Sequence, residues 1–90
     1  MKRVEIMAAQ AVREDILESL SLLGVPSHHT IIPVVHGRGN TMPKLGDAVW
    51  PEENFLMIIY CEDDVVRRIE QAVELVRKKY DHEGIGLFVL

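Results

Sequence analysis

The chain has 90 residues, a formal net charge of −4 at pH 7 and a pI near 5.5. This balance excludes an ordinary nucleic-acid binder, because no lysine- and arginine-rich stripe is available to neutralise phosphates. The chain has no run of about 18 apolar residues, so we expect no membrane insertion. The length indicates one domain over residues 1–90, with a core thin enough to gain from a partner subunit.

Cysteine content and the N-terminus both suggest a cytoplasmic protein. A single cysteine, Cys61, excludes an intramolecular disulfide and gives no CxxC spacing for zinc. It ends an apolar run, which is typical of a small buried side chain. The residues after Lys2 and Arg3 alternate instead of forming an unbroken apolar region, so we expect no signal peptide.

The first part of the chain alternates and then changes period. Residues 4–9 predict a strand with Val4, Ile6 and Ala8 on one face. Apolar residues then recur at helical spacing, which predicts an amphipathic helix. Its inner positions are Val12, Ile16, Leu20 and Leu23. Gly24 and Pro26 end this helix, since glycine tolerates a left-handed cap and proline cannot extend the helix.

Two further strands flank a long polar segment. Residues 28–36 are rich in Ile, Val and Thr and predict a strand, in which Pro33 indicates an edge position or a bulge. A segment punctuated by Gly and Pro follows over residues 37–53. Residues 54–61 are apolar at odd and even positions, which predicts a strand buried on both sides.

A second helix and a last strand complete the pattern. The acidic residues 62–64 indicate a helix start, where a side-chain oxygen caps free amides. The inner stripe is Val65, Val66, Ile69, Ala72, Val73 and Val76. We expect a surface pair between Glu74 and Lys78, basic residues 77–79 to complement the helix dipole, a turn over 80–84 and a strand over 85–90.

The element order β-α-β, loop, β-α-β predicts a ferredoxin-like βαββαβ sandwich of the α+β class. Right-handed crossovers place both helices on one face of a four-stranded antiparallel sheet. Strands two, three and four are apolar on their other face as well. A closed homo-oligomer packing sheet against sheet would cover that face without a second gene product.

The 37–53 segment is where we expect function to reside. Structureless loops beyond about 12 to 15 residues are uncommon in a compact domain unless they bind something or are disordered. Trp50 is the only tryptophan, and it either contacts a partner or packs against its own subunit. Lys44 and Arg38 are the only fixed positive charges of the loop, and either could contact an anion or an acidic patch of a partner.

Three runs of residues resemble the PII signalling-protein superfamily, whose members are trimers of ferredoxin-like subunits. Gly37, Arg38 and Gly39 are similar to its Gly-Arg-Gln run. Residues 60–66, Tyr-Cys-Glu-Asp-Asp-Val-Val, resemble its strand-to-helix junction, and residues 84–89, Gly-Ile-Gly-Leu-Phe-Val, resemble its glycine-containing loop and last strand. The resemblance covers essentially the whole chain.

The resemblance implies a homotrimer that regulates an unidentified partner protein. The region from Gly37 onward would be the mobile T-loop that docks on partners. The Gly84 region would be the B-loop, which helps hold a nucleotide phosphate in the cleft between subunits. The implied ligand is an adenine nucleotide or another small anion.

The chain departs from the family pattern at several places. Gly39 stands where the family has its magnesium-binding glutamine, and the 37–53 segment has no tyrosine for uridylylation. No lysine stands near residues 84–86, and the sequence stops at Leu90, before the basic tail of nitrogen-regulating members. We interpret the chain as PII-like and not as an ordinary nitrogen regulatory protein.

The residues themselves fit an anion site. Arg38 has a fork that grips a phosphate bidentately, and Gly37, Gly39, Gly84 and Gly86 expose backbone amides. The alternative is that these glycines only permit a positive φ at turns.

A divalent transition metal is the second ligand that the residues allow. His28 and His36 share a strand face but lie roughly 26 Å apart at about 3.3 Å per residue, too far for one metal within a subunit. A site would need a trimer axis, or a loop carboxylate such as Asp47 folding back onto His36. Imidazole and carboxylate together suit zinc, copper or nickel. Solvated strand-end histidines are the simpler alternative.

Catalytic patterns are missing from the sequence. It has no trustworthy Ser-His-Asp or Cys-His spacing, no HExxH and no GxxxxGK phosphate loop. We therefore expect no enzyme but a trimeric sensor of a small ligand. The alternatives are a metal-binding or metal-tolerance protein of the CutA-like kind and a trimeric interaction module without a ligand.

Overall fold

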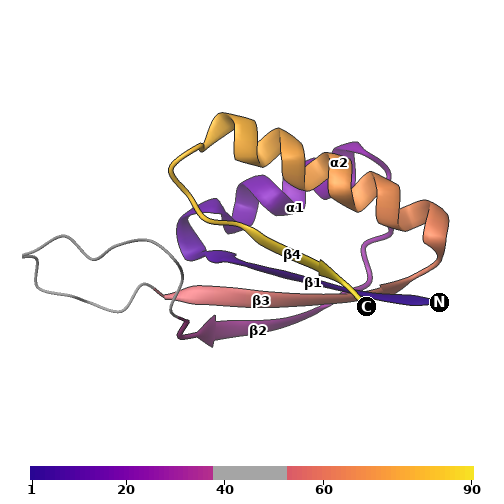
Figure 1. Ribbon diagram of the computed structural model, residues 1–90, viewed down its shortest axis with the longest axis horizontal. Helices are drawn as coiled ribbons and strands as arrows, with labels where there is room; N and C mark the ends of the chain where they lie inside the picture. Colours follow the sequence, from indigo (N-terminus) through magenta and orange to yellow (C-terminus); the bar gives the residue numbers. More distant parts are fainter. Residues whose placement is uncertain (38–52) are drawn as a thin grey trace, which may run out of the picture.

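A computed structural model describes residues 1–37 and 53–90 (Figure 1). The elements in chain order are β1 (Lys2–Ala9), a 3₁₀ turn (Gln10–Val12), α1 (Arg13–Leu22), β2 (Thr30–Val35), β3 (Asn54–Cys61), α2 (Asp63–Lys79) and β4 (Gly86–Val89). The sheet order is β2-β3-β1-β4, with every neighbouring pair antiparallel. The ferredoxin-like prediction is therefore confirmed.

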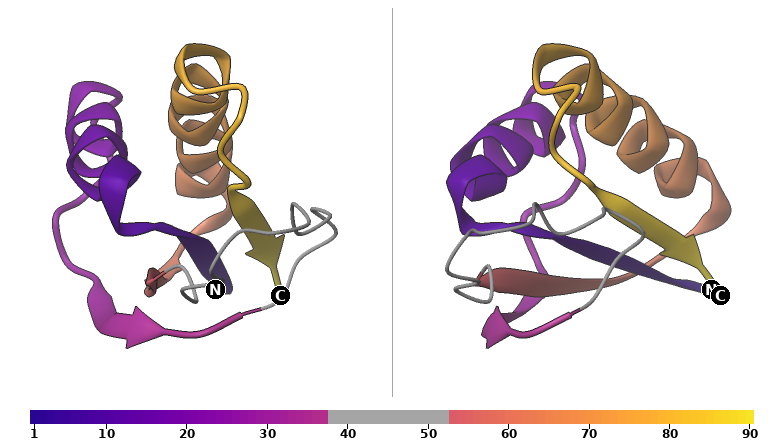
Figure 2. Two further views of the ribbon diagram at one scale, coloured as in Figure 1. Left: turned by 90° about the vertical axis from the view of Figure 1, so that its left-hand side faces the viewer. Right: turned by 60° about the vertical axis from the view of Figure 1, so that its left-hand side comes forward.

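Both helices lie on the same face of the sheet, and the opposite face is left open (Figure 2). The central strands β1 and β3 pair along their full length, from Lys2 opposite Cys61 to Ala9 opposite Asn54. Because side chains alternate across a strand, one residue in two faces the helices. The strand residues buried there are Val4, Ile6, Ala8, Phe55, Met57, Ile59 and Cys61.

The helices supply the other half of this core with the predicted stripes. Val12, Ile16 and Leu20 of the first stripe are buried, and Leu23 is half-buried against the core. In α2, Val66, Ile69, Ala72, Val73 and Val76 are buried and Val65 is half-buried. The buried Ser19 hydroxyl donates to the carbonyl of Ala72 at 2.7 Å, so one hydrogen bond joins the two helices inside the core.

The end of α1 follows the predicted glycine cap. Gly24 has a φ of +72°, and it is the only positive-φ residue within the described ranges. The left-handed turn lets the amides of Gly24 and Val25 donate to Ser21 and Leu20 at 3.0 Å each. The carbonyls of Leu20 and Ser21, in the last turn of the helix, are thereby satisfied.

Pro33 lies where the sequence predicted it, on an edge strand that is also irregular. β2 is at the edge of the sheet, and its register with β3 shifts between Ile32 and Val35. The strand is shorter than predicted, because it spans only residues 30–35, and His28 and His36 lie outside it. The simple alternation that placed these histidines on one strand face is therefore wrong.

Two local predictions for α2 are also wrong. Glu62 occupies the N-cap position, but its side chain makes no capping hydrogen bond. Glu74 pairs with Arg77, at 3.4 Å, where the sequence predicted Lys78. The acidic first turn and the basic last turn of α2 are present, so the charges still complement the helix dipole.

The described helices include none that is long and apolar enough to cross a membrane.

Two leucines on α1 test the placement of the core. Leu20 is 5% exposed and Leu22 is 78% exposed. Leu20→Ala should lower the free energy of unfolding by about 2–5 kcal/mol, because it removes buried methyl groups and leaves a cavity. Leu22→Ala, the same change on the same helix, should cost less than about 0.5 kcal/mol. Urea unfolding of both variants measures the difference, and equal losses would contradict this placement of α1.

Candidate functional site

The face of the sheet opposite the helices is apolar and uncovered. The register places one set of residues there together: Arg3, Glu5, Met7, Thr30, Ile32, Leu56, Ile58, Tyr60 and Phe88. Ile32 is 42% exposed and Phe88 48%, whereas Leu56 and Ile58 are half-buried. We call this set the open face. In the single chain β3 is thus buried on one side and mostly half-buried on the other, and the cover of its second face by another copy stays a prediction.

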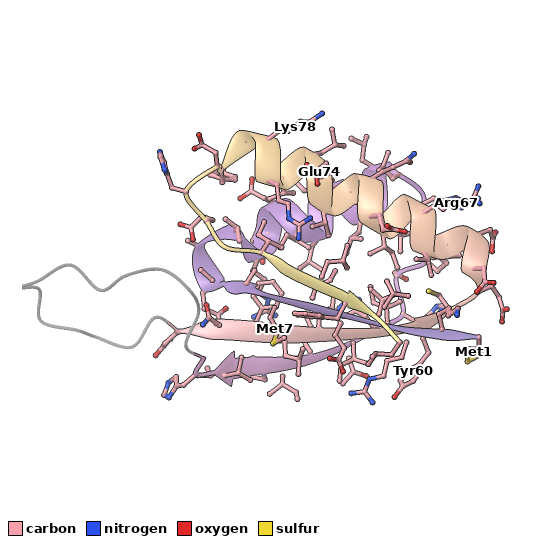
Figure 3. All side chains as sticks on the ribbon, viewed as in Figure 1. Met1, Met7, Tyr60, Arg67, Glu74 and Lys78 are labelled. Atoms are coloured by element: carbon pink, nitrogen blue, oxygen red, sulfur yellow. The ribbon has the colours of Figure 1, made fainter. Side chains whose placement is uncertain are left out.

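A polar cluster occupies one end of the open face. The guanidinium of Arg3 donates through Nε to Glu5 Oε2 at 2.9 Å and through Nη1 to the Tyr60 hydroxyl oxygen at 3.2 Å. In Figure 3, Met7 and Tyr60 mark the two ends of this face, with Tyr60 beside the chain termini. The end of the open face nearer Met7 is apolar.

The segment between α2 and β4 carries the glycines predicted to hold a ligand. Ile85 is buried, and its carbonyl accepts a 2.7 Å hydrogen bond from Nη2 of Arg77 in the last turn of α2. The segment is therefore fixed on one side by the core and on the other by a cation. Arg77 brings to residues 84–86 the positive charge that no lysine of the sequence supplies there.

The glycines of this segment are not required by backbone conformation. Neither Gly84 nor Gly86 has a positive φ, and the same holds for Gly37. A Cβ on Gly84 would meet nothing within 4 Å, whereas one on Gly86 would lie 3.0 Å from the Phe88 ring. The alternative that these three glycines serve positive-φ turns is therefore wrong. Gly84 leaves open space beside its backbone.

The two halves of the predicted ligand site lie at the same end of the sheet but at opposite edges. Val35 of β2 pairs with Asn54, which pairs with Ala9 of β1, and Gly86 pairs with Met7, two residues away. Between Gly37 after β2 and Gly86 in β4 lie three strand spacings, about 14 Å in total. One subunit does not bring these glycines together.

A separate groove runs between the helices on the far side of the molecule. It is lined by Leu22, Leu75, Val76 and polar residues of both helices, among them Asp15 and Lys79. None of the predicted ligand residues lines it.

The sequence matches no protein-family model and no curated protein. Solved structures are similar over 99% of the chain. A PII-like signalling protein from Thermus thermophilus has 22% identity and a TM-score of 0.64, with 83% of its own chain covered. CPII from Thiomonas intermedia K12, a nitrogen regulatory PII-like protein bound to ADP, AMP and bicarbonate, has 19% identity and a TM-score of 0.72, with 86% covered. The chain has the fold of PII-like signalling proteins.

Only some of the residues predicted to bind a ligand or a partner lie in the described part of the chain. Gly37 is exposed at the end of β2, and Gly84 and Gly86 lie before and within β4. Arg38, Gly39, Lys44, Asp47 and Trp50 lie outside the described residues, so their predicted roles stay predictions.

The base of the 37–53 segment is held by Gln10, which sequence reasoning did not single out. Its side chain donates to the carbonyls of Pro33 and Asn54, and its backbone amide donates to the carbonyl of Glu53 at 3.1 Å. One residue of the 3₁₀ turn thus connects the strand before the segment to the strand after it. No periodicity in the sequence indicates this contact, because it joins residues more than 20 positions apart.

The metal prediction gains no support from the described residues. His36 is exposed, and residues 1–37 and 53–90 contain no group of three or more His, Cys, Asp or Glu that could hold an ion. His82 faces solvent and pairs with Asp81 at 3.4 Å.

Gly84 provides a stability test of the glycine argument. Gly84→Ala should raise the free energy of unfolding by about 0.4–1 kcal/mol, because the unfolded chain loses freedom and the folded chain gains no clash. Gly24→Ala should lower it by about 1 kcal/mol, since the positive φ strains alanine. Urea unfolding compares the two, and destabilisation by Gly84→Ala would contradict the open space at residue 84.

Cys61 provides a pH test of the fold around β3. Burial, followed by the charges of Glu62, Asp64 and Asp63, raises the pKa of the Cys61 thiol above its ordinary value of 9.0. The unfolded chain therefore loses this proton first as the pH rises, which lowers the free energy of unfolding above about pH 9. Between pH 7.5 and 9.5, the wild type should lose more stability in urea than Cys61→Ala. Equal losses would contradict the buried thiol.

Proposed function

We propose that this chain is a PII-like regulatory protein that assembles as a homotrimer and binds an adenine nucleotide or another small anion between its subunits. The ligand signals to a partner protein through residues 37–53. The observation that carries the proposal is the position of the predicted ligand residues, at one end of the sheet but on opposite edges. A site that uses both edges needs two copies of the chain.

Self-association follows from the open face. Burying apolar surface contributes about 25 cal/mol per Å², so exposed side chains such as Ile32 and Phe88 favour association. Apolar patches of this kind are unusual on monomers and common at interfaces. We expect a closed ring of three copies to cover every open face and to bring the β2 edge of one copy beside the β4 edge of the next.

The β4 edge offers the chemistry that an anion needs. Arg77 holds the Ile85 carbonyl with Nη2 and Glu74 Oε2 with Nη1 at 3.4 Å, and its side chain is 38% exposed, so the guanidinium is partly open to an anion. Gly84 leaves room for a ligand beside the backbone. Arg38, which follows Gly37 in the sequence, would contribute a second guanidinium from the neighbouring copy, as a bidentate phosphate contact.

Known ligands of a similar protein support this chemistry. CPII has been solved with ADP, AMP and bicarbonate and also without ligand. Its ligands are anions, as the proposal requires. In this chain, Gln10 joins the strand before residues 37–53 to the strand after them, and we expect these contacts to carry the effect of a bound ligand to that segment.

Thermal unfolding with a ligand panel tests the proposed function. The panel holds ATP, ADP, AMP, 2-oxoglutarate, bicarbonate, zinc, copper and nickel. A ligand at a hundredfold excess over its Kd adds about 2.7 kcal/mol of stability, which should raise the midpoint by several degrees. We expect a nucleotide to do so.

Arginine variants make the test specific. Arg38→Ala should weaken nucleotide binding at least about tenfold, because it removes a charge-assisted contact. Arg67→Ala, which removes an exposed arginine of α2 (labelled in Figure 3), should bind as the wild type does. Stabilisation only by metals would favour the CutA-like function, and silence across the panel would favour an interaction module. Either result would overturn the proposal.

A further inference from the structure

The polar cluster of the open face lies at the end of that face nearer the chain termini, among residues that an interface between copies would cover. Arg3 Nη2 lies 2.8 Å from Glu5 Oε2, and the Arg3 guanidinium carbon lies 5.7 Å from the centre of the Tyr60 ring. Both charged residues come from the central strand β1, and Tyr60 is the cross-strand neighbour of Arg3 on β3. The Glu5 side chain is only 20% exposed, so the single chain already removes much of its water.

The cluster leaves one donor and one acceptor unused. Arg3 donates to the Tyr60 hydroxyl oxygen, so the hydroxyl proton is free for another acceptor. Both short contacts of Arg3 go to Oε2 of Glu5, and within the described residues Oε1 receives no hydrogen bond. A tyrosine hydroxyl and a carboxylate oxygen complement each other. Each copy of the chain therefore carries both halves of one further hydrogen bond.

Charge on the open face points to another copy of the chain as its occupant. Within the four described strands, Arg3 and Glu5 are the only charged residues on this face, and they neutralise each other. A strongly acidic or basic partner would meet no complementary field. A second copy brings the same apolar residues and the same unused donor and acceptor.

We infer that the Arg3, Glu5 and Tyr60 cluster fixes how copies of this chain pack, with the Tyr60 hydroxyl of one copy donating to Glu5 of a neighbour. This inference rests on the proposed self-association and assigns its specificity to three residues. Apolar contacts drive association but tolerate sliding of one sheet over another. A buried hydrogen-bonded ion pair does not, because misplacement leaves a charge without a partner.

The helix side carries a matched control cluster. Asp15 accepts from Lys79 Nζ at 3.3 Å and from the Tyr80 hydroxyl at 3.2 Å, and Lys79 lies 5.3 Å from the Tyr80 ring centre. This cluster also consists of a cation, a carboxylate and a tyrosine. It differs in position, and the hydroxyl proton of Tyr80 is already used within the chain.

Sedimentation equilibrium of matched tyrosine variants tests the inference. Tyr60→Phe keeps the ring and removes the hydroxyl, and it should raise the concentration at half-dissociation at least about tenfold. Tyr80→Phe should leave that concentration unchanged, although it removes a hydrogen bond from the folded chain. Equal behaviour of the two variants would overturn the inference.

Carboxylate variants provide the second readout. Glu5→Gln leaves Arg3 without a counter-charge in the interface and should raise the half-dissociation concentration at least about a hundredfold, whereas Asp15→Asn should not change it. The double variant Arg3→Met with Glu5→Leu removes both charges but also the acceptor of the Tyr60 hydroxyl, so it should associate more tightly than Glu5→Gln and more weakly than the wild type. It also keeps the test decisive if Glu5→Gln fails to fold, because a double variant that associates as tightly as the wild type would contradict the role of the pair.

The failure of this inference differs from the failure of the proposed function. If the wild type is a monomer, self-association and the proposed function fall together with the inference. If the wild type associates and the Tyr60 and Glu5 variants associate equally well, the inference alone is overturned.

Discussion

The two β-α-β crossovers of the chain are the constraint on which the rest of the structure depends. They carry α1 and α2 over the same face of one antiparallel sheet, and the described part of the chain has no further element to cover the other face. The strands are nevertheless apolar on that second face, from Ile32 on β2 to Phe88 on β4. Within the described residues nothing covers this second face, and we propose that another copy of the chain does.

The same constraint separates the residues of the proposed ligand site. An antiparallel order of β2-β3-β1-β4 separates residue 37 from residues 84–86 by the width of the sheet. Association through the open face would join these edges between copies, so assembly and ligand binding would be coupled. Within one chain, Arg77 fixes the Ile85 carbonyl before β4. Gln10 holds the base of the 37–53 segment, beside the end of β2.

Much of the fold could be predicted from periodicity alone. The alternation of Val4, Ile6 and Ala8 and the stripe of α2 identify buried faces, because burial and period are directly connected. Gly24 likewise indicated its left-handed turn. The strand at residues 54–61 was harder, since its sequence shows that both faces are apolar but not what covers each of them.

Contacts of long side chains were beyond such reasoning. Arg77 and Lys78 are both within reach of Glu74, and the sequence offered no reason to choose Arg77. Arg77 also donates to the Ile85 carbonyl, and this contact holds its side chain near Glu74. The connection after α2 brings that carbonyl beside the last turn of the helix, which the sequence does not indicate. Gln10 is similar, because its partners Pro33 and Asn54 approach only through strand pairing. For residues 38–52 the ligand and partner roles stay predictions.

The mass of the wild-type protein in dilute solution tests the central claim most directly. Sedimentation equilibrium should give three times the chain mass of 10.2 kDa, unchanged over a wide range of protein concentrations. A mass of one chain, persisting at high protein concentration, would show that the open face needs no cover and would contradict the account.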